Sequence, residues 1–220
     1  SRRAWLTVTA FGVALGLMNF TFYSSLAHLP IGVAVTIEFI GPLTLAAALS
    51  RRWLDAVAVL AAAGGVVLIS EALHTPWAEL EKTGIALALL AGAFWAAYIV
   101  LAGRTGAEFP KLEGLAIAMV VATVVTLPLG AFSAPSWTPE ILLKAFGIAV
   151  LSSVLPYSLE LLALRRLGAK VFGILLSLEP AFAALAGLIV LDQVLSPTQL
   201  VGMALVVTAS ALVLGLGARR

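Results

Sequence analysis

Apolar residues along the chain fall into eight runs, each long enough to cross a membrane as a helix. The runs cover residues 4–26, 31–49, 53–70, 84–103, 113–132, 142–164, 170–191 and 198–217. Short polar or proline-containing breaks separate them, and the runs lack the strict alternation of membrane β-strands. Since about 20 apolar residues span the ~30 Å hydrocarbon core, the pattern predicts an all-α polytopic membrane protein with eight transmembrane helices.

Composition narrows the class of protein further. Of the 220 residues, 62% are hydrophobic and 11% are charged, whereas soluble domains are about 45–50% apolar. Eight crossings fill this length, so no soluble catalytic domain fits beside them. The chain has no cysteine, and His28 and His74 lie in predicted loops with no second ligand nearby, so neither a metal site nor a cofactor is predicted. Catalytic and nucleotide-binding motifs are absent from the sequence, so we expect no enzyme and no nucleic-acid partner.

The positions of the basic residues predict the orientation of the spans. Cytoplasmic loops of membrane proteins are enriched in Lys and Arg. If residue 1 lies inside, eight crossings leave only Lys82 and Lys144 outside and place the other eleven of the 13 basic residues inside. Those eleven are Arg2, Arg3, Arg51, Arg52, Arg104, Lys111, Arg165, Arg166, Lys170, Arg219 and Arg220. Both ends of the chain are therefore expected in the cytoplasm.

A weak internal repeat appears at an offset of 138 residues. Ile40-Gly41-Pro42-Leu43 aligns with Leu178-Glu179-Pro180-Ala181. The two copies begin on opposite sides of the membrane, which predicts an inverted repeat of the kind that encloses a transport path. We predict a first repeat over 1–72 with three helices and a second over 84–217 with five. The simplest explanation for the difference is a ten-helix transporter whose first two helices precede Ser1.

Three carboxylates lie inside predicted spans, where an acidic side chain costs roughly 2.5–3.5 kcal/mol to insert. They are Glu38, Glu160 and Glu179. We interpret them as substrate-binding or coupling groups that face the protein interior or a wet cavity, with protons as the candidate coupling ion. The alternative is a structural carboxyl that joins helices, and Glu160 is close enough to Arg165 in sequence to form an ion pair.

Prolines and polar aromatic residues accompany these acids. Pro42, Pro156 and Pro180 lie within spans and predict helix kinks that free backbone carbonyls. Further polar or aromatic groups at membrane depth are Asn19, Trp95, Tyr98 and Tyr157. Trp95 and Tyr98 are three residues apart and share one helix face.

Several of these segments resemble a known family. They read GAFWAAYI at 92–99, GRTG at 103–106, LPYSLE at 155–160, LEPA at 178–181 and IEFIGPL at 37–43. Together they resemble the EamA family of the drug/metabolite transporter superfamily, and within it the inner-membrane threonine and homoserine exporter branch. The resemblance implies ten helices in two inverted five-helix repeats, and this chain matches from the third helix onward.

The resemblance also implies a function, which is the export of small amino acids across the bacterial inner membrane by alternating access around a central cavity. A zwitterionic substrate needs a counter-charge for its ammonium group and donors for its carboxylate. Glu38 or Glu179 would supply the first, and Tyr98, Tyr157 and Asn19 the second. Export of another metabolite, such as a purine, a vitamin or a drug, is the alternative. A membrane scaffold and an intramembrane enzyme fit the buried acids and the repeat less well, and the oligomeric state is left open.

Overall fold

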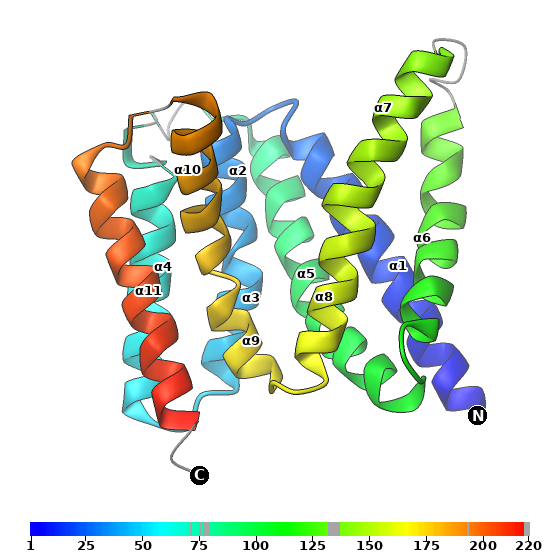
Figure 1. The fold of residues 1–220 in the computed structure, drawn as a ribbon, viewed down its shortest axis with the longest axis horizontal. Coiled ribbons are helices and arrows are strands. Elements are labelled where there is room, and N and C mark those ends of the chain that lie inside the picture. Colours follow the sequence, from blue (N-terminus) through cyan, green and yellow to red (C-terminus); the bar gives the residue numbers. More distant parts are fainter. Residues whose placement is uncertain (71, 75, 77–79, 132–136, 193, 218–220) are drawn as a thin grey trace. The chain divides into compact units, whose positions relative to one another are not determined.

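In the computed structural model, all regular secondary structure among the described residues is helical. The structure describes residues 1–70, 72–74, 76, 80–131, 137–192 and 194–217. Its helices are α1 (Arg2–Ser25), α2 (Ile31–Glu38), α3 (Ile40–Ala48), α4 (Trp53–Ile69), the 3₁₀-helix η1 (Ala72–His74), α5 (Lys82–Glu108), α6 (Glu113–Ala131), α7 (Pro139–Ala149), the π-helix η4 (Val150–Val154), α8 (Leu155–Leu164), α9 (Ala169–Leu175), α10 (Leu178–Leu191) and α11 (Pro197–Gly217) (Figure 1).

These helices confirm the eight predicted spans. Five spans are single helices, and three are built from consecutive pieces, namely α2–α3, α7–η4–α8 and α9–α10. Five described segments are long and apolar enough to cross a membrane: Arg2–Ser25, Ile31–Ala48, Lys82–Glu108, Pro139–Leu164 and Ala169–Val190. Trp53–Ile69, Glu113–Pro128 and Pro197–Val213 are shorter apolar helices. Arg219 and Arg220, which entered the charge count, lie outside the described residues.

Two of the interruptions follow from proline. Proline has no N–H to donate to the carbonyl four residues earlier, and its ring crowds that carbonyl. For Pro42 this carbonyl belongs to Glu38, the last residue of α2, and for Pro180 it belongs to Leu176, in the break between α9 and α10. Each proline therefore lies in the first turn of the helix that resumes the span.

The third interruption is the π-helix η4. Pro156 is the second residue after it and removes the donor for the carbonyl of Ser152. The N–H of Leu155 bonds instead to the carbonyl of Val150, five residues earlier. Such single π turns widen a helix locally and are frequent at functional sites.

The chain divides into two compact units. Unit 1 comprises residues 1–20 and 97–167, and unit 2 comprises residues 21–96 and 168–220. Each unit combines segments from both predicted repeats. Compact units and sequence repeats are thus different divisions of this chain, and the repeat boundaries at 1–72 and 84–217 stay a prediction.

Repeat-related elements lie within the same unit. Adding 138 to the bounds of α1 gives 140–163, which matches the segment Pro139–Leu164 in unit 1. In unit 2, Phe39 between α2 and α3 falls on Ser177 between α9 and α10. Figure 1 shows that α1 runs opposite to α7–α8, and that α2–α3 runs opposite to α9–α10. This is the relation that an inverted repeat requires.

Small residues allow the helices within each unit to pack closely, as is usual in membrane proteins. In unit 2, α4 and α11 meet where a Cβ on Gly65 would lie 2.8 Å from the carbonyl oxygen of Gly202, and a Cβ on Gly202 would lie 2.7 Å from that of Gly65. In unit 1, a Cβ on Gly16 of α1 would lie 3.2 Å from the carbonyl oxygen of Ala122 in α6.

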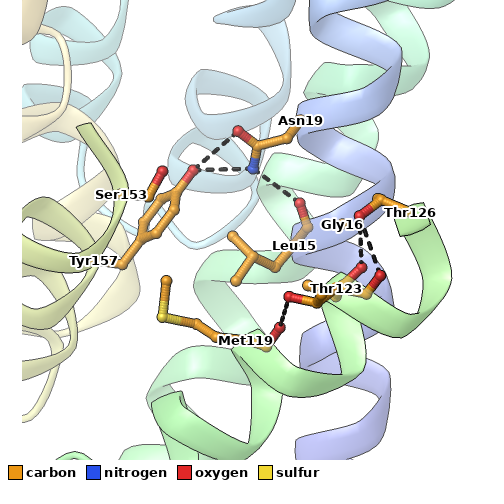
Figure 2. A pocket seen from close by; sticks show the side chains of 9 residues that line it. Leu15, Gly16, Asn19, Met119, Thr123, Thr126, Ser153 and Tyr157 are labelled. Carbon is orange, nitrogen blue, oxygen red and sulfur yellow. Dashed lines mark hydrogen bonds between the residues drawn. The ribbon is translucent and has the colours of Figure 1, made fainter. Parts of the chain in front are cut away.

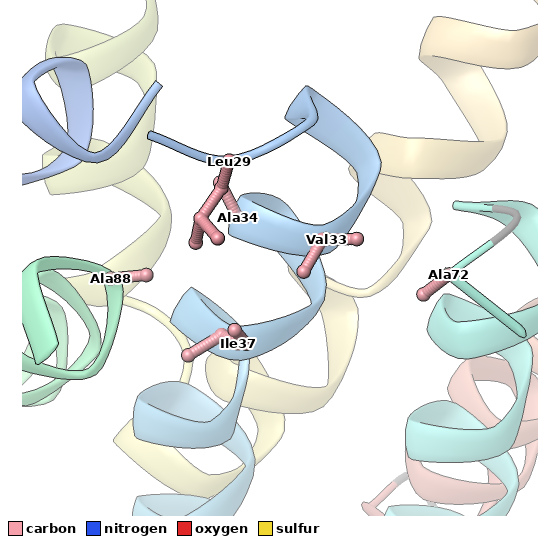
Figure 3. Packing of buried hydrophobic residues seen from close by; sticks show 6 residues of the cluster. All are labelled: Leu29, Val33, Ala34, Ile37, Ala72 and Ala88. Atoms are coloured by element: carbon pink, nitrogen blue, oxygen red, sulfur yellow. The ribbon is translucent and has the colours of Figure 1, made fainter. Parts of the chain in front are cut away.

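A buried hydrophobic cluster holds α2 in unit 2. Its members are Leu29, Val33, Ala34, Ile37, Ala72 and Ala88 (Figure 3). Val33 and Ile37 are four residues apart and therefore lie on one face of α2. The cluster fixes the last turn of α2, where Glu38 lies.

Candidate functional site

Unit 1 contains a hydrogen-bonded pair formed by the buried Tyr98 and the partly buried Glu160. The Tyr98 hydroxyl donates a hydrogen bond of 2.6 Å to Oε2 of Glu160. Tyr98 is completely buried, and its ring packs against Phe11 and Tyr157 with centroid distances of 5.4 and 5.7 Å. A hydrogen bond to a carboxylate inside an apolar unit is strong and geometrically well defined.

A second pair continues this polar group. Nδ2 of Asn19 lies 3.0 Å from the Tyr157 hydroxyl and donates a further bond of 2.9 Å to the carbonyl of Leu15 (Figure 2). The Tyr157 hydroxyl lies 3.3 Å from Oδ1 of Asn19. Asn19 and Tyr157 are 138 residues apart, which is the offset of the predicted repeat, and they contact each other. Asn19, Tyr157, Tyr98 and Glu160 therefore form one connected set, which we call the unit 1 polar chain.

Helix geometry explains why these side chains meet. Tyr157 and Glu160 are three residues apart on α8, so both project from one face. Asn19 follows Gly12 and Gly16 on the face of α1 that approaches α6. Tyr98 lies in the middle of the long helix α5. The packing of α1, α5 and α8 thus brings together four polar residues that the sequence had indicated one by one.

Arg165 has partners other than Glu160. Its Nη2 donates a hydrogen bond of 2.7 Å to the carbonyl of Phe109 and another to the carbonyl of Lys111. Lys111 has a positive φ of 46°, which turns the chain between α5 and α6. Arg165 thus anchors this connection, and the partner found for Glu160 in the described part of the chain is Tyr98.

Two carboxylates are placed in unit 2. Glu38 ends α2 and is only 8% exposed, whereas Glu179 in the first turn of α10 is exposed. They lie close enough for their charges to repel each other. Within the described residues no Lys, Arg or His lies in ion-pair distance of Glu38. A carboxylate buried without a cation is the functional candidate that physical chemistry favours most in a membrane protein.

Close backbone contacts fix Glu38. A Cβ on Gly92 of α5 would lie 2.5 Å from the Glu38 carbonyl oxygen, and a Cβ on Gly41 would overlap the Gly92 carbonyl. Trp95, one turn further along α5, packs its ring edge-on against Phe39 at 4.8 Å. Trp95 therefore supports the chain next to Glu38.

An ion pair that was not predicted from the sequence joins α4 and α9 in unit 2. Nζ of Lys170 lies 2.9 Å from Oδ2 of Asp55, and the Asp55 side chain is 3% exposed. Asp55 is the third residue of α4, and because charges at span ends are usually solvated, the sequence did not predict a buried acid there. Its position inside an apolar run is the signal that would have identified it.

Replacing Lys170 by Met should destabilise the protein by about 2 kcal/mol, because the Asp55 carboxylate would stay buried without its cation. Removing one partner of a fully buried pair costs about 3–5 kcal/mol. We expect a smaller effect here because Lys170 is partly exposed. Thermal unfolding in detergent measures this. Lys144→Met is the matched control, since Lys144 and Glu140 form an exposed i,i+4 pair. Equal stability of both variants would contradict the expectation.

Comparisons with known proteins agree with this architecture. A sequence profile of the EamA-like transporter family matches residues 82–215. The threonine/homoserine exporter RhtA of Escherichia coli strain K12 is 41% identical over 207 residues, which cover 93% of this chain and 70% of the exporter. The exporter of the same name from Salmonella typhimurium strain LT2 is 40% identical over the same shares. A solved crystal structure that is 19% identical shares the fold with a TM-score of 0.79, over 96% of this chain and 77% of that one. This chain belongs to the EamA-like transporter family.

Proposed function

We propose that this protein exports small amino acids, with threonine and homoserine as its substrates, through the bacterial inner membrane. The observation that carries the proposal is the 41% identity to a threonine/homoserine exporter over 93% of the chain. The substrate crosses unchanged, by alternating access around a central cavity. Both ends of the chain lie in the cytoplasm in this proposal, because that orientation places eleven of 13 basic residues inside.

Glu38 supplies the counter-charge for the substrate's ammonium group. Its carboxylate is buried, and no cation pairs with it among the described residues. Glu179 keeps that region negative, since its charge acts on Glu38. An incoming ammonium group relieves the repulsion between the two carboxylates, so the pair binds a cationic group better than either acid alone.

The unit 1 polar chain supplies hydrogen-bonding groups. Asn19 and Tyr157 hold each other in place, and Tyr98 is held by Glu160. Groups oriented in this way lose little entropy when they bind a polar ligand. Glu160 is also a candidate proton carrier, because a carboxyl inside a membrane span gains and loses its charge with its surroundings.

The broken helices supply the flexibility that alternating access needs. The breaks after Glu38 and at Leu176 are repeat-related, and each has a proline in the following turn, Pro42 and Pro180. Discontinuous helices near bound substrate are common in transporters with inverted repeats. In this proposal the two repeats comprise residues 1–72 and 84–217, and each contributes one of the broken helices.

Ligand stabilisation tests the substrate assignment. Threonine and homoserine at about 100 times their Kd should each stabilise the purified protein in detergent by about 2.7 kcal/mol, seen as a higher unfolding temperature. Valine of similar shape, a purine base and a vitamin serve as comparisons. If the purine or the vitamin stabilises the protein and threonine does not, the substrate assignment is wrong and the result supports export of another metabolite.

A further inference from the structure

Unit 1 contains a small polar pocket beside the Asn19–Tyr157 pair (Figure 2). Its volume is about 270 Å³, just below the 300–1,000 Å³ typical of small-molecule sites. The pocket is lined by Leu15, Gly16, Asn19, Met119, Ala122, Thr123, Thr126, Ser153 and Tyr157. This lining contains several hydroxyl groups and one amide but no charged side chain. The pocket therefore suits a small, neutral, polar group.

The hydroxyl groups of the lining differ in what they can offer a ligand. Thr123 donates to the carbonyl of Met119 at 2.8 Å, and Thr126 donates to that of Ala122 at 2.9 Å. Their protons are in use, so their oxygens remain as acceptors. For the Ser153 hydroxyl, no hydrogen bond is found in the described part of the chain. It is free both to donate and to accept.

The π-helix places Ser153 in this lining. Ser153 lies within η4, and Tyr157 follows it by four residues, so both reach the same pocket. At the repeat offset of 138, Ser153 corresponds to Leu15 and Tyr157 corresponds to Asn19, and all four line the pocket. At this pair of positions the first predicted repeat contributes the apolar Leu15, and the second contributes the hydroxyl of Ser153. A pocket lined by both apolar side chains and hydroxyl groups matches a short side chain that carries both a methylene or methyl group and a hydroxyl.

We infer that this pocket binds the side-chain hydroxyl of the transported amino acid, with the Ser153 hydroxyl as its direct partner. The inference rests on the proposed function and adds the determinant of specificity to it. The charged ends of the substrate stay outside the pocket, because a buried charge needs a counter-charge that this lining lacks. A site built to bond a hydroxyl discriminates against the analogue without one, since its own polar groups are then left unpaired.

The test uses 2-aminobutyrate, which is both threonine and homoserine without the hydroxyl. Uptake of the three labelled compounds is measured in inverted membrane vesicles that contain the complete natural protein. Ser153→Ala should lower the transport efficiency for threonine and homoserine by about 3- to 10-fold, the value of one hydrogen bond, and leave that for 2-aminobutyrate unchanged. Ser153→Thr, which keeps the hydroxyl, should retain the preference for threonine and homoserine over 2-aminobutyrate.

Ser152→Ala is the matched control. Ser152 belongs to the same π turn but lines a different cavity, with Lys144 and Gly147, so its loss should leave the preference intact. If the wild-type protein transports threonine and Ser153→Ala keeps the wild-type preference at normal membrane levels, the pocket assignment is overturned and the proposed function stands. If the wild-type protein transports none of the three compounds, the proposed function fails, and this inference fails with it.

Discussion

Replacing Glu38 by glutamine should lower threonine export by one to two orders of magnitude while the protein still inserts into the membrane. Glutamine keeps the size of the side chain but removes the charge that the proposed site offers to an ammonium group. A charge-assisted hydrogen bond is worth about 1.5–3 kcal/mol, which corresponds to a loss of about 10- to 100-fold in transport efficiency. Export from cells that accumulate threonine, normalised to the amount of protein in the membrane, measures the effect.

Two further variants make the test of Glu38 specific. Glu113→Gln removes an exposed carboxylate from the first turn of α6 and should leave export unchanged. Glu179→Gln should weaken export, since Glu179 contributes negative charge to the same region. Full export by both Glu38→Gln and Glu179→Gln would show that transport does not need these carboxylates, and would contradict their proposed role in binding the ammonium group.

The second large effect is structural and is expected at Gly65. Gly65→Ala should destabilise the protein by about 3 kcal/mol, at the upper end of the usual penalty for overpacking. Its Cβ would lie 2.5 Å from Cγ1 of Val206 and 2.8 Å from the carbonyl oxygen of Gly202, so α4 and α11 must separate. The change is measured as the midpoint of thermal or denaturant unfolding in detergent.

The neighbouring glycine provides the control. A Cβ on Gly64 would meet only Cδ1 of Leu205, at 4.0 Å, which is ordinary contact. Gly64→Ala should therefore leave stability unchanged or raise it slightly, because alanine is the better helix former. If the two alanine variants unfold at the same midpoint, the close approach of α4 and α11 is not what stabilises unit 2.

Hydrophobic runs were sufficient to predict the spans, because the length of an apolar segment is set by membrane thickness alone. The runs at 31–49 and 170–191 also contained the two prolines that interrupt them. The sequence predicted kinks at Pro42 and Pro180, whereas the ends of the flanking helices depend on which carbonyl loses its donor. The exact residues at which these helices end and resume are therefore known only from the backbone of the structure.

The candidate site was predictable as a set of residues but not as a set of contacts. A polar residue in an apolar run stands out by composition, which is why Asn19, Tyr98, Tyr157 and Glu160 were all identified. Their pairing depends on how helices distant in sequence pack. Proximity along the chain suggested Arg165 as the partner of Glu160, but Arg165 reaches backbone carbonyls in the turn before α6. The sequence did not predict a role for Ser153, because the hydroxyl of a serine in a helix usually bonds to a backbone carbonyl of the same helix.

Transport of labelled threonine into inverted vesicles tests the central claim most directly. In these vesicles the cytoplasmic face points outward, so an exporter takes up its substrate from the medium. The complete natural protein is expected to accumulate threonine or to exchange it for homoserine loaded inside the vesicles, and Glu38→Gln is expected to do so far less efficiently. An imposed pH gradient that drives accumulation indicates proton coupling, and uptake independent of the gradient indicates facilitated transport. The absence of both accumulation and exchange, for threonine and for homoserine alike, would contradict the account.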